Sequence, residues 1–419
     1  MCTSAGGSHK HGLWRHFLPA GLLIGLLCVV LPAQSPIEVV ESVPAEVDLG
    51  LAETANTLEV WLEMIRSARE RIDIELFYLS HRPGEPLEKI IHALQEAAQR
   101  GVTIRIIADG KFYRIYPEML DSLNTLPHIE VRILTIFNRR GGVQHAKYFV
   151  VDNRDVFIGS QNFDWRALKH IHELGLRVRS EPLARLILQV FHLDWKLAQD
   201  ATKMAPLDSL PEDRLISSEK PLTLDGNGES IELYPTFSPV NDSLTFPNLT
   251  HDEEALVALI SRARKRILIQ LLNYEPQSNG RFYAVLDNAL KAAAARGVQI
   301  RLLVSDWNTR KPGIFYLKSL QVLPNIEVRF TSLPAYSGGF IPFARVEHCK
   351  LMVVDDTWVW VGTSNWAESY FHRSRNLGLV VKSPRITQTI SRTFFKSWNS
   401  RYAQEVNPCQ EYIPPRIEP

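Results

Sequence analysis

The sequence has little cysteine, little net charge and no long basic stripe. Only four cysteines occur in 419 residues, and two of them, Cys2 and Cys28, lie within the first 35. The remaining two, Cys349 and Cys409, are too few for the disulfide framework of a small secreted domain. With 47 basic and 46 acidic residues the formal net charge is +1. Because the chain as a whole does not attract polyanions, any phosphate binding must be local.

The N-terminus carries an apolar run, Phe17–Leu31, preceded by Lys10 and Arg15. Basic residues before such a run and small residues after it are typical of a secretory signal. We expect residues 1–35 to be a signal peptide or an N-terminal membrane anchor, because the run is shorter than the roughly 20 residues of a spanning helix, while Pro36 disfavours cleavage. Membrane contact could occur through this segment. Either interpretation predicts export of the rest of the chain, to the endolysosomal or ER lumen in a eukaryote, or to the periplasm or extracellular space in a bacterium.

The rest of the chain is an internal repeat, recognised from blocks that recur in the same order. The matched pairs are Met64–Ser80 with Leu259–Glu275, Ala93–Gly110 with Ala289–Trp307, and Leu126–Leu134 with Leu323–Thr331. Each copy has the pattern helix, strand, helix, three strands, helix, with buried β-branched strands. The predicted fold class is therefore α/β, with two pseudo-twofold-related repeats and the active site at their seam.

The repeat also predicts the division of the chain. We expect a first repeat at 40–205, an inter-repeat linker at 206–250, a second repeat at 251–405 and a C-terminal tail at 406–419. Two Asn-x-Ser/Thr sequons, at Asn241 and Asn248, fall in the linker, where a glycan would be sterically acceptable.

One motif, His-x-Lys-x-x-x-x-Asp, occurs in both repeats and is followed each time by a glycine, hydroxyl residues and an asparagine. The first copy comprises His145, Lys147, Asp152 and Asn162, and the second comprises His348, Lys350, Asp355 and Asn365. On a strand the histidine and lysine point to one face, so the intervening Cys349 points away and is read as a packing residue. The aspartates fall at strand ends, where a carboxylate can order the next turn.

Imidazole, ammonium and amide groups that converge on one spot make a phosphate site. Two copies would place a histidine on each side of one phosphorus, which suits in-line displacement by a nucleophile with a general acid opposite. Two lysines and two asparagines, Lys147, Lys350, Asn162 and Asn365, can bind the phosphate and carry its charge. Histidine pairs also ligate zinc, but a lysine beside each histidine opposes a second cation. We therefore expect no catalytic metal and no cofactor.

With this duplicated motif the sequence resembles the phospholipase D superfamily over nearly all of residues 40–405. The segments "FDWRALKHIHELG" and "GTSNWAESYF" are most similar to its endolysosomal, membrane-anchored 5′ exonucleases and to the poxvirus envelope phospholipase-like proteins of the same branch. The resemblance implies that the two histidines, lysines and asparagines line the active site, with Asp152 and Asp355 in support. Asp355 departs from the glutamate-like ending of the second motif in that branch.

An asymmetry between the repeats suggests separate roles for the histidines. Glu173 stands 28 residues after His145, whereas the same count after His348 reaches Asn376. In the superfamily an acidic residue near this place orients the motif histidine, and a carboxylate behind an imidazole raises its basicity. We therefore expect Glu173 to lie behind His145, with His145 as nucleophile and His348 as general acid.

Two enzymatic functions remain open on the sequence, and the intact motifs disfavour an inactive scaffold. The first is a metal-independent phosphodiesterase that forms a phosphohistidine and acts as a 5′ exonuclease on single-stranded nucleic acid. Aromatic residues near the motifs are candidates either for stacking bases or for packing the core: Phe77, Tyr78, Trp165, Trp307, Trp366 and Tyr370. The second is a phospholipase D or transphosphatidylase that acts on membrane glycerophospholipids, for which an exposed apolar loop at Tyr336–Phe343 is a candidate contact. The oligomeric state is not indicated.

Overall fold

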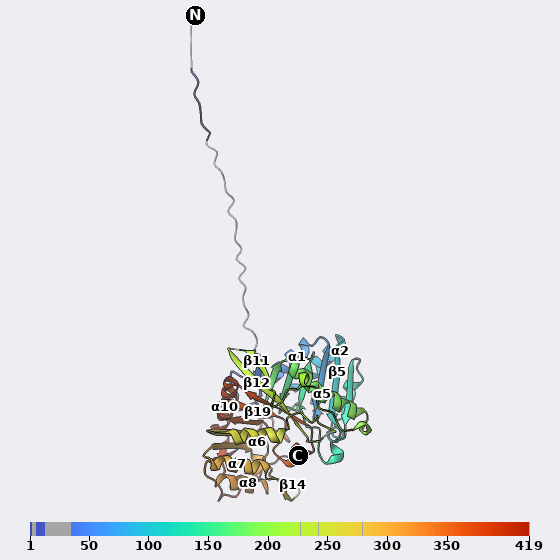
Figure 1. Cartoon of the computed structure of the whole chain (residues 1–419), viewed down its shortest axis with the longest axis vertical. Coiled ribbons are helices and arrows are strands. Elements are labelled where there is room, and N and C mark those ends of the chain that lie inside the picture. The colour runs from blue at the N-terminus through green and yellow to red at the C-terminus, as the bar shows by residue number, and fades with distance from the viewer. Residues whose placement is uncertain (2–5, 13–34, 227, 242, 279, 419) are drawn as a thin grey trace. The chain divides into compact units, whose positions relative to one another are not determined.

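The computed structural model describes residues 1, 6–12, 35–226, 228–241, 243–278 and 280–418. The expected signal or anchor falls mainly on residues 13–34, and with Cys2 and Cys28 it lies outside the described residues. Within the described part, no helix combines the length and the apolar character that crossing a bilayer requires. Contacts divide the chain into residues 1–34 and one compact unit, residues 35–419, to which all that follows refers (Figure 1).

The first repeat is built on an eight-stranded mixed sheet with the order β2-β1-β10-β8-β7-β3-β5-β6. In it β3, β5 and β6 run parallel, while β7, β8 and β10 form antiparallel pairs. The strands are β1 (Ile37–Ser42), β2 (Ala55–Asn56), β3 (Arg71–Leu76), β5 (Thr103–Asp109), β6 (Ile129–Leu134), β7 (Tyr148–Val151), β8 (Asp155–Gly159) and β10 (Glu173–Arg179). The helices are α1 (Thr57–Ser67), α2 (Leu87–Gln99), α3 (Gly110–Tyr113), α4 (Glu118–Asn124) and α5 (Glu181–Gln199).

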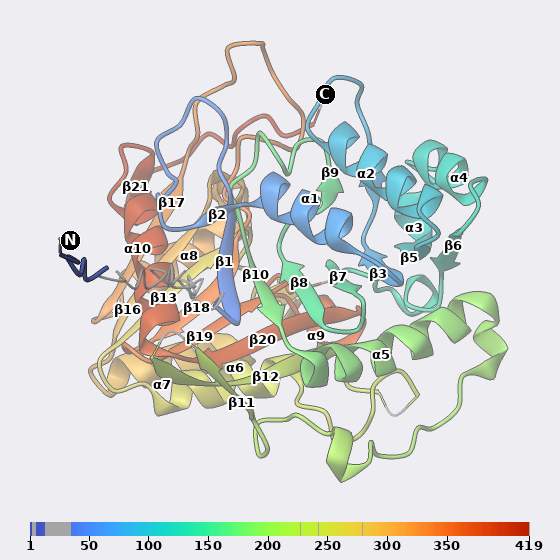
Figure 2. The ribbon, with the colours of Figure 1, turned by 90° about the horizontal axis from the view of Figure 1, so that it is seen from above.

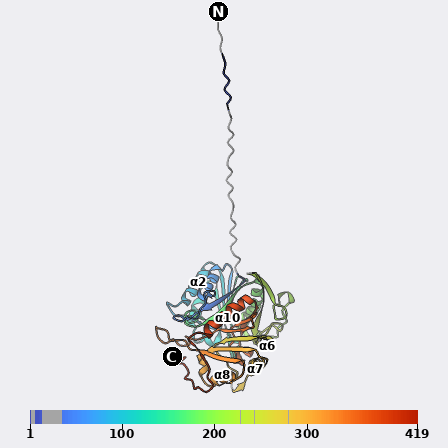
Figure 3. The same ribbon diagram turned by 90° about the vertical axis from the view of Figure 1, so that its left-hand side faces the viewer.

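The second repeat uses the same plan in a nine-stranded sheet, β11-β12-β20-β19-β18-β13-β16-β17-β21. Its strands are β11 (Leu222–Gly226), β12 (Glu229–Ser238), β13 (Arg266–Leu271), β16 (Gln299–Ser305), β17 (Ile326–Thr331), β18 (Lys350–Val354), β19 (Trp358–Gly362), β20 (Asn376–Lys382) and β21 (Ala403–Glu405). Its helices are α6 (Asp252–Arg262), α7 (Val285–Ala295), α8 (Gly313–Gln321), α9 (Glu368–His372) and α10 (Pro384–Trp398). Figure 3 views this repeat from the side of α10, with α6, α7 and α8 beside it. The predicted α/β class with two repeats is confirmed.

Short pairs lie outside the two large sheets. They are β4 (Leu79–Ser80) with β9 (Phe163–Asp164), and β14 (Gln277–Ser278) with β15 (Arg281–Phe282). Four 3₁₀ turns are described in the chain, at Asn138–Arg140, Ala201–Lys203, Glu212–Arg214 and Asp306–Thr309.

Local sequence explains how the long closing helices begin in both repeats. The hydroxyls of Ser180 and Ser383 accept the backbone N–H of Leu183 and Ile386, and a proline occupies the first turn of each helix. A serine cap followed by proline is a strong start signal, because the serine oxygen accepts a free N–H group of the first turn and proline has no N–H that needs an acceptor.

Side-chain alternation along the strands creates the layers. On β7, Phe149 and Val151 join the core beneath α1 and α2, whereas Tyr148 and Val150 face the opposite side, towards α5. That second core is continuous across both repeats. Strands β8 and β10 contact β19 and β20 there, as Figure 2 shows, so the carboxyl-terminal halves of the two sheets meet at a seam.

The predicted boundaries need correction at the linker. Residues 206–250, expected to be a linker, include β11 and β12, and β12 pairs with β20 as β1 pairs with β10. The edge strand of the second repeat therefore lies inside the presumed linker. The first repeat likewise starts at Ile37, before residue 40. The C-terminal tail, expected at 406–419, contacts the second repeat, because the carbonyl of Ile417 accepts the N–H of Phe343.

The second sequon is less open than the sequence suggests. The side chain of Asn248 is half-buried, its Nδ2 donates to the carbonyl of Leu210 at 2.9 Å, and its Oδ1 accepts the N–H of Leu210 at 2.9 Å. A glycan on Nδ2 would alter this pairing, so Asn248 serves the fold. The side chain of Asn241 accepts the nearby N–H of Ser243, and among the described residues no hydrogen bond ties it to a distant segment.

The motif aspartates brace turns and do not face the histidines. Asp152 accepts the N–H groups of Arg69, Glu70 and Arg71 at 2.9, 2.8 and 3.0 Å, in the turn between α1 and β3. It follows His145 by seven residues, roughly 23 Å of extended chain. Because both carboxylate oxygens of Asp152 accept backbone N–H groups, this aspartate stabilises the fold and does not bind the phosphate.

Asp355 makes the matching contacts in the second repeat. It accepts the N–H groups of Arg264, Lys265 and Arg266 at 3.1, 2.7 and 3.1 Å. These contacts fit the supporting role that the family resemblance implies for Asp152 and Asp355.

Replacing Asp152 by Ala should lower the free energy of unfolding by about 1–3 kcal/mol, because three backbone donors lose their acceptor. The control is Asp356→Ala, which removes only exposed ion pairs and should cost less than about 0.5 kcal/mol. Urea unfolding measures both. An Asp152→Ala protein with wild-type stability but no turnover would show instead that the carboxylate takes part in the chemistry.

Candidate active site

The histidine and lysine of the first motif lie just before the central strand β7, and those of the second lie just before β18 and at its first residue. Lys147 Nζ donates to the carbonyl of His145 at 2.5 Å, and Lys350 Nζ donates to the carbonyl of His348 at 2.7 Å. The identical fold-back in both repeats places each ammonium beside its own imidazole. The structure thus brings the four predicted side chains of the two motifs together as two equivalent pairs.

Each motif is held by the other repeat. The N–H of His145 donates to the carbonyl of Arg375 at 2.9 Å, and the N–H of Arg375 donates to Val143 at 3.0 Å. In the same way the N–H of His348 donates to the carbonyl of His172 at 2.9 Å. This reciprocal exchange is what a pseudo-twofold axis through the site requires, and it makes the site a property of the seam.

Behind His348 stands Glu173, whose Oε2 lies 2.7 Å from Nδ1 of the imidazole. The expectation that Glu173 supports His145 is therefore wrong. The cause is the seam: β10 begins at Glu173 directly beside the bridge between His172 and Glu347, so its first side chain reaches into the opposite repeat. Counting residues along one repeat could not reveal this crossing.

Behind His145 stands Asn376, with Oδ1 3.0 Å from Nδ1 of the imidazole. The amide nitrogen of Asn376 donates to Ser238 Oγ and to the carbonyl of Tyr370, while Thr363 donates to Oδ1. Since Oδ1 is thereby the accepting atom, His145 carries its proton on Nδ1. Glu173 likewise accepts from Nδ1 of His348, so Nε2 of both rings is left for chemistry.

The site is almost closed to solvent, and its charges are strongly coupled. Burial lowers the pKa of His145 well below its usual range, and the cations of Lys147 and Lys350 lower it further. Burial also lowers the pKa of His348 well below its usual range, and the charges of Lys350, Lys147 and His145 lower it further. Burial lowers the pKa of Lys350 to about 8 although Glu173 opposes this, and burial raises the pKa of Glu173 to about 8 although Lys350 opposes that. A bound anion would relieve this excess of buried positive charge.

Two amides complete the predicted set. Asn162 and Asn365 are 6% and 5% exposed, and each has an Oδ1 without a hydrogen-bond partner among the described residues. They follow β8 and β19, the strands that pair with β7 and β18 of the two motifs.

Arg375 ties the seam to the first repeat through a buried ion pair that the sequence did not reveal. Its Nε and Nη2 bind the carboxylate of Asp194 at 2.6 and 2.8 Å, and both side chains are at most 1% exposed. The carbonyl of Arg375 accepts the N–H of His145, and the next residue, Asn376, orients the imidazole of His145. By holding Arg375 in place, Asp194 therefore helps to position His145 without touching it. The signal in the sequence is slight: Arg375 matches His172 when the repeats are aligned.

Aromatic rings flank His145 on two sides. Phe77 and Tyr370 approach the imidazole edge-on, with centroids at 4.8 and 4.7 Å. Phe77 is followed by Phe112, Tyr78 and Tyr116 in a continuous run of rings with centroid separations of 4.0, 5.4 and 5.3 Å. We call Phe77, Tyr78, Phe112 and Tyr116 the aromatic shelf; all four are half-buried, which leaves part of each ring accessible.

Trp366, another aromatic candidate from the sequence, is only 2% exposed and packs in the core. Trp165 is half-buried and carries the guanidinium of Arg82 over its ring at 4.9 Å. Position in sequence near the motifs therefore does not predict access to the site.

Metal-ligating side chains gather at one place among the described residues, at His172, Glu347 and Cys349. At the phosphate site the ammonium groups of two lysines lie beside the imidazoles, and their charge opposes a bound cation. That the reaction needs no metal remains a prediction.

Two repeats with paired imidazoles, ammonium groups and amides at their seam define a phosphodiesterase class, and comparison with known proteins agrees. The model of the family "Cardiolipin synthase, PLD-like domain" matches residues 61–195 and again residues 256–398. The chain belongs to the phospholipase D superfamily and is a phosphodiesterase of it.

Relatives of this chain cover nearly its whole length. It is 33% identical over 393 residues to "Phospholipase D Z" of Dictyostelium discoideum, covering 88% of this chain and 90% of that one. It is 30% identical over 418 residues to "5'-3' exonuclease PLD4" of Mus musculus, covering 89% and 81%. Among solved structures, phosphatidylserine synthase of Haemophilus influenzae has a TM-score of 0.59 at 13% identity, with 88% and 87% covered, which supports the fold alone.

Replacing Asp194 by Ala should lower the free energy of unfolding by about 3–5 kcal/mol, because the guanidinium of Arg375 would stay buried without its counter-charge. Asp194→Asn keeps the shape and hydrogen-bonding oxygen, and should cost clearly less. Urea unfolding of both variants tests this. Equal stability of Asp194→Ala and wild type would mean that the ion pair does not hold the seam.

Proposed function

We propose that this phosphodiesterase is a 5′ exonuclease on single-stranded nucleic acid that works through a covalent phosphohistidine. The observation that carries the proposal is the aromatic shelf beside His145. A row of partly accessible rings next to a phosphate site suits a chain of bases joined by phosphates, because every base has a face that can stack. The similarity to the mouse relative named as a 5'-3' exonuclease supports the same substrate class.

We assign the nucleophile to His348, reversing the expectation from the sequence. The glutamate that stabilises positive charge on an imidazole lies behind His348, and the phosphorylated ring bears such a charge. His145 has only a neutral amide behind it, so its imidazolium is the stronger acid and gives up a proton more readily.

In the first step Nε2 of His348 attacks phosphorus, the bond to the leaving oxygen breaks, and the proton on Nε2 of His145 goes to that oxygen. In the second step His145 takes a proton from water, the hydroxide attacks phosphorus, and the bond to His348 breaks. Lys147, Lys350, Asn162 and Asn365 hold the remaining phosphate oxygens throughout. No metal enters either step.

The two histidine variants should differ in what they accumulate. In His145→Ala, His348 should still attack the phosphorus of a substrate that has a good leaving group. The reaction should then stall at the covalent intermediate, because no base activates water. His348→Ala should form no covalent species. Each variant is mixed with a radiolabelled activated phosphodiester, quenched, and examined for acid-labile label on the protein. Label on His348→Ala and none on His145→Ala would reverse the assignment.

The pH dependence should respond to the charge of Lys147. Because this cation lowers the pKa of His145, Lys147→Gln should raise that pKa and keep the general acid protonated at higher pH. The alkaline limb of kcat/KM should then move to higher pH, although the maximum falls. Lys265→Gln, at an exposed lysine, is the control and should leave the limb in place. A limb that moves to lower pH, or does not move in Lys147→Gln, would contradict the proposed electrostatics.

The aromatic shelf should matter for oligonucleotides and not for small substrates. Phe112→Ala removes one ring, and stacking worth about 1–3 kcal/mol predicts a roughly 5- to 150-fold rise in KM for single-stranded DNA. Turnover of a small activated phosphodiester should change little. The control is Phe315→Ala, at an exposed ring on α8. Equal losses on both substrates in Phe112→Ala would mean that the ring only supports the fold.

The second candidate function is a phospholipase D or transphosphatidylase, and one observation favours it. In the loop Tyr336–Phe343, Phe340 and Phe343 are 44% and 41% exposed, as an apolar membrane contact would require. Phosphatidylcholine vesicles and a labelled single-stranded oligonucleotide offered in parallel decide between them. We expect turnover of the oligonucleotide from its 5′ end; release of choline alone would establish the lipid enzyme.

We also propose that the catalytic unit works outside the cytosol, delivered by the N-terminal segment as a signal or an anchor. The basic residues before the apolar run Phe17–Leu31 support this. Fractionation of cells expressing the full chain, with protease protection of residues 35–419, tests it; a cytosolic, protease-accessible product would contradict it.

A further inference from the structure

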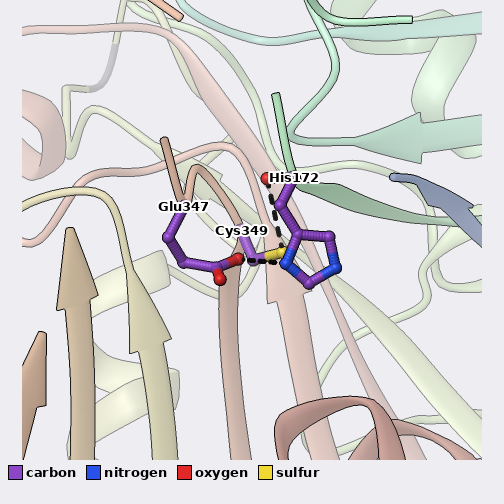
Figure 4. Close-up of side chains that lie close together, drawn as sticks. All are labelled: His172, Glu347 and Cys349. Atoms are coloured by element: carbon purple, nitrogen blue, oxygen red, sulfur yellow. Dashed lines mark hydrogen bonds and ion pairs between the residues drawn. The ribbon is translucent and has the colours of Figure 1, made fainter. Parts of the chain in front are cut away.

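Three potential metal ligands converge next to the catalytic strand of the second repeat. They are Nδ1 of His172, a carboxylate oxygen of Glu347 and Sγ of Cys349, all within 4.8 Å of one another. Figure 4 shows the imidazole, carboxylate and thiol turned towards each other. His172 comes from the first repeat and the other two from the second, so the cluster spans the seam.

The cluster is fully buried and its polar atoms are poorly satisfied. All three residues are 0% exposed. Nδ1 of His172 lies 2.5 Å from Oε1 of Glu347 as an ion pair, and Oε2 of Glu347 has no hydrogen-bond partner among the described residues. Sγ of Cys349 makes one weak contact, 3.7 Å from the carbonyl of His172. Buried polar groups of this kind normally find a partner, and an ion is one of the few that would serve all three.

A fourth residue prepares the imidazole for a metal. Nε2 of His172 lies 2.8 Å from Oε1 of Glu41, which is 2% exposed. A carboxylate on the far nitrogen of a histidine is the usual support of a metal-binding imidazole, because it fixes the tautomer and directs the other nitrogen to the metal. Here that nitrogen is Nδ1, the one facing Glu347 and Cys349.

Charge and donor type point to zinc. A divalent cation would replace the proton on Nδ1 and the proton on Sγ, so its binding leaves the net charge of the buried cluster unchanged. Nitrogen, carboxylate oxygen and thiolate together are a donor set of zinc sites. With bonds of about 2.0–2.3 Å, Nδ1 and Oε1 would need to separate by under about 1 Å.

The two motifs provide an internal comparison. The second motif reads Glu347-His348-Cys349-Lys350, and the equivalent positions of the first read Gln144-His145-Ala146-Lys147. In the first repeat, Gln144 and Ala146 thus stand in place of Glu347 and Cys349, and neither is a usual zinc ligand. The catalytic pair is the same in both, so the glutamate and the cysteine are not needed for the histidine and lysine to adopt their shared geometry.

We propose that His172, Glu347 and Cys349 bind one zinc ion that joins the two repeats. Glu347 and Cys349 alternate with His348 along the chain and point away from its imidazole, so the ion lies on the opposite side from the phosphate. Its role is structural: it cross-links the seam beside the histidine and glutamate pair and takes no part in the phosphoryl transfer described above.

The test is metal content and a spectroscopic signature in the full chain. The protein is incubated with zinc, dialysed extensively, and analysed by mass spectrometry for metal. Wild type should retain about one zinc per chain and melt at a higher temperature than the same protein stripped by a chelator. Cobalt in place of zinc should give a thiolate-to-cobalt charge-transfer band in the near ultraviolet.

The matched variant is Glu347→Gln with Cys349→Ala, which copies the first motif and should fold as that repeat does. It should lose the zinc and the cobalt band. Cys349→Ser, which nearly keeps the volume, is a second variant and should lose the band. Cys409→Ala, at the exposed second cysteine, should keep both.

A wild-type chain that retains no zinc and gives no thiolate band would overturn the proposal and leave a protonated His172 bridging two carboxylates. Zinc retained equally by the double variant would also overturn it, because the ion would then be bound elsewhere. None of these readouts depends on the substrate, so they are independent of the proposed exonuclease activity.

Discussion

The whole site depends on the exchange of backbone hydrogen bonds across the seam. Residues 143–145 pair with Arg375, and residues 346–348 pair with His172. Because each exchange brings the next residue behind the opposite imidazole, Glu173 reaches His348 and Asn376 reaches His145. Neither repeat owns a complete catalytic half, and the difference between the two histidines arises only when the repeats are packed together.

This packing also explains the electrostatics. Lys147 and Lys350 are 1% and 0% exposed at the seam, and the charge of each lysine lowers the pKa of both imidazoles. Burial and the like charge of the lysines both lower the pKa of the two histidines, so the imidazoles of the free site lose their protons readily. The buried positive charge of the lysines favours the binding of an anion. The buried ion pair of Arg375 with Asp194 lies at the same seam and links the two repeats.

Much of this could be predicted from the sequence, because the relevant signals are local or repeated. The α/β class and the two motifs follow from matching blocks, and the turn-bracing position of Asp152 follows from its place at a strand end. The partner of Glu173 could not be predicted, because which imidazole it faces depends on contacts between residues 175 apart. For the same reason the cluster of His172, Glu347 and Cys349 has no spacing signature, and β12 was hidden in a segment whose pairing partner, β20, lies far along the chain.

We propose that the carboxylate of Glu173, which reaches His348 across the seam, decides which histidine becomes phosphorylated. The most direct measurement is to exchange the two supports, Glu173→Gln with Asn376→Asp, trap the covalent intermediate with an activated phosphodiester, and locate the modified histidine by peptide mass spectrometry. The account predicts phosphate on His348 in the wild type and on His145 in the exchanged enzyme. Phosphate on His145 in the wild type, or on His348 in both proteins, would contradict it.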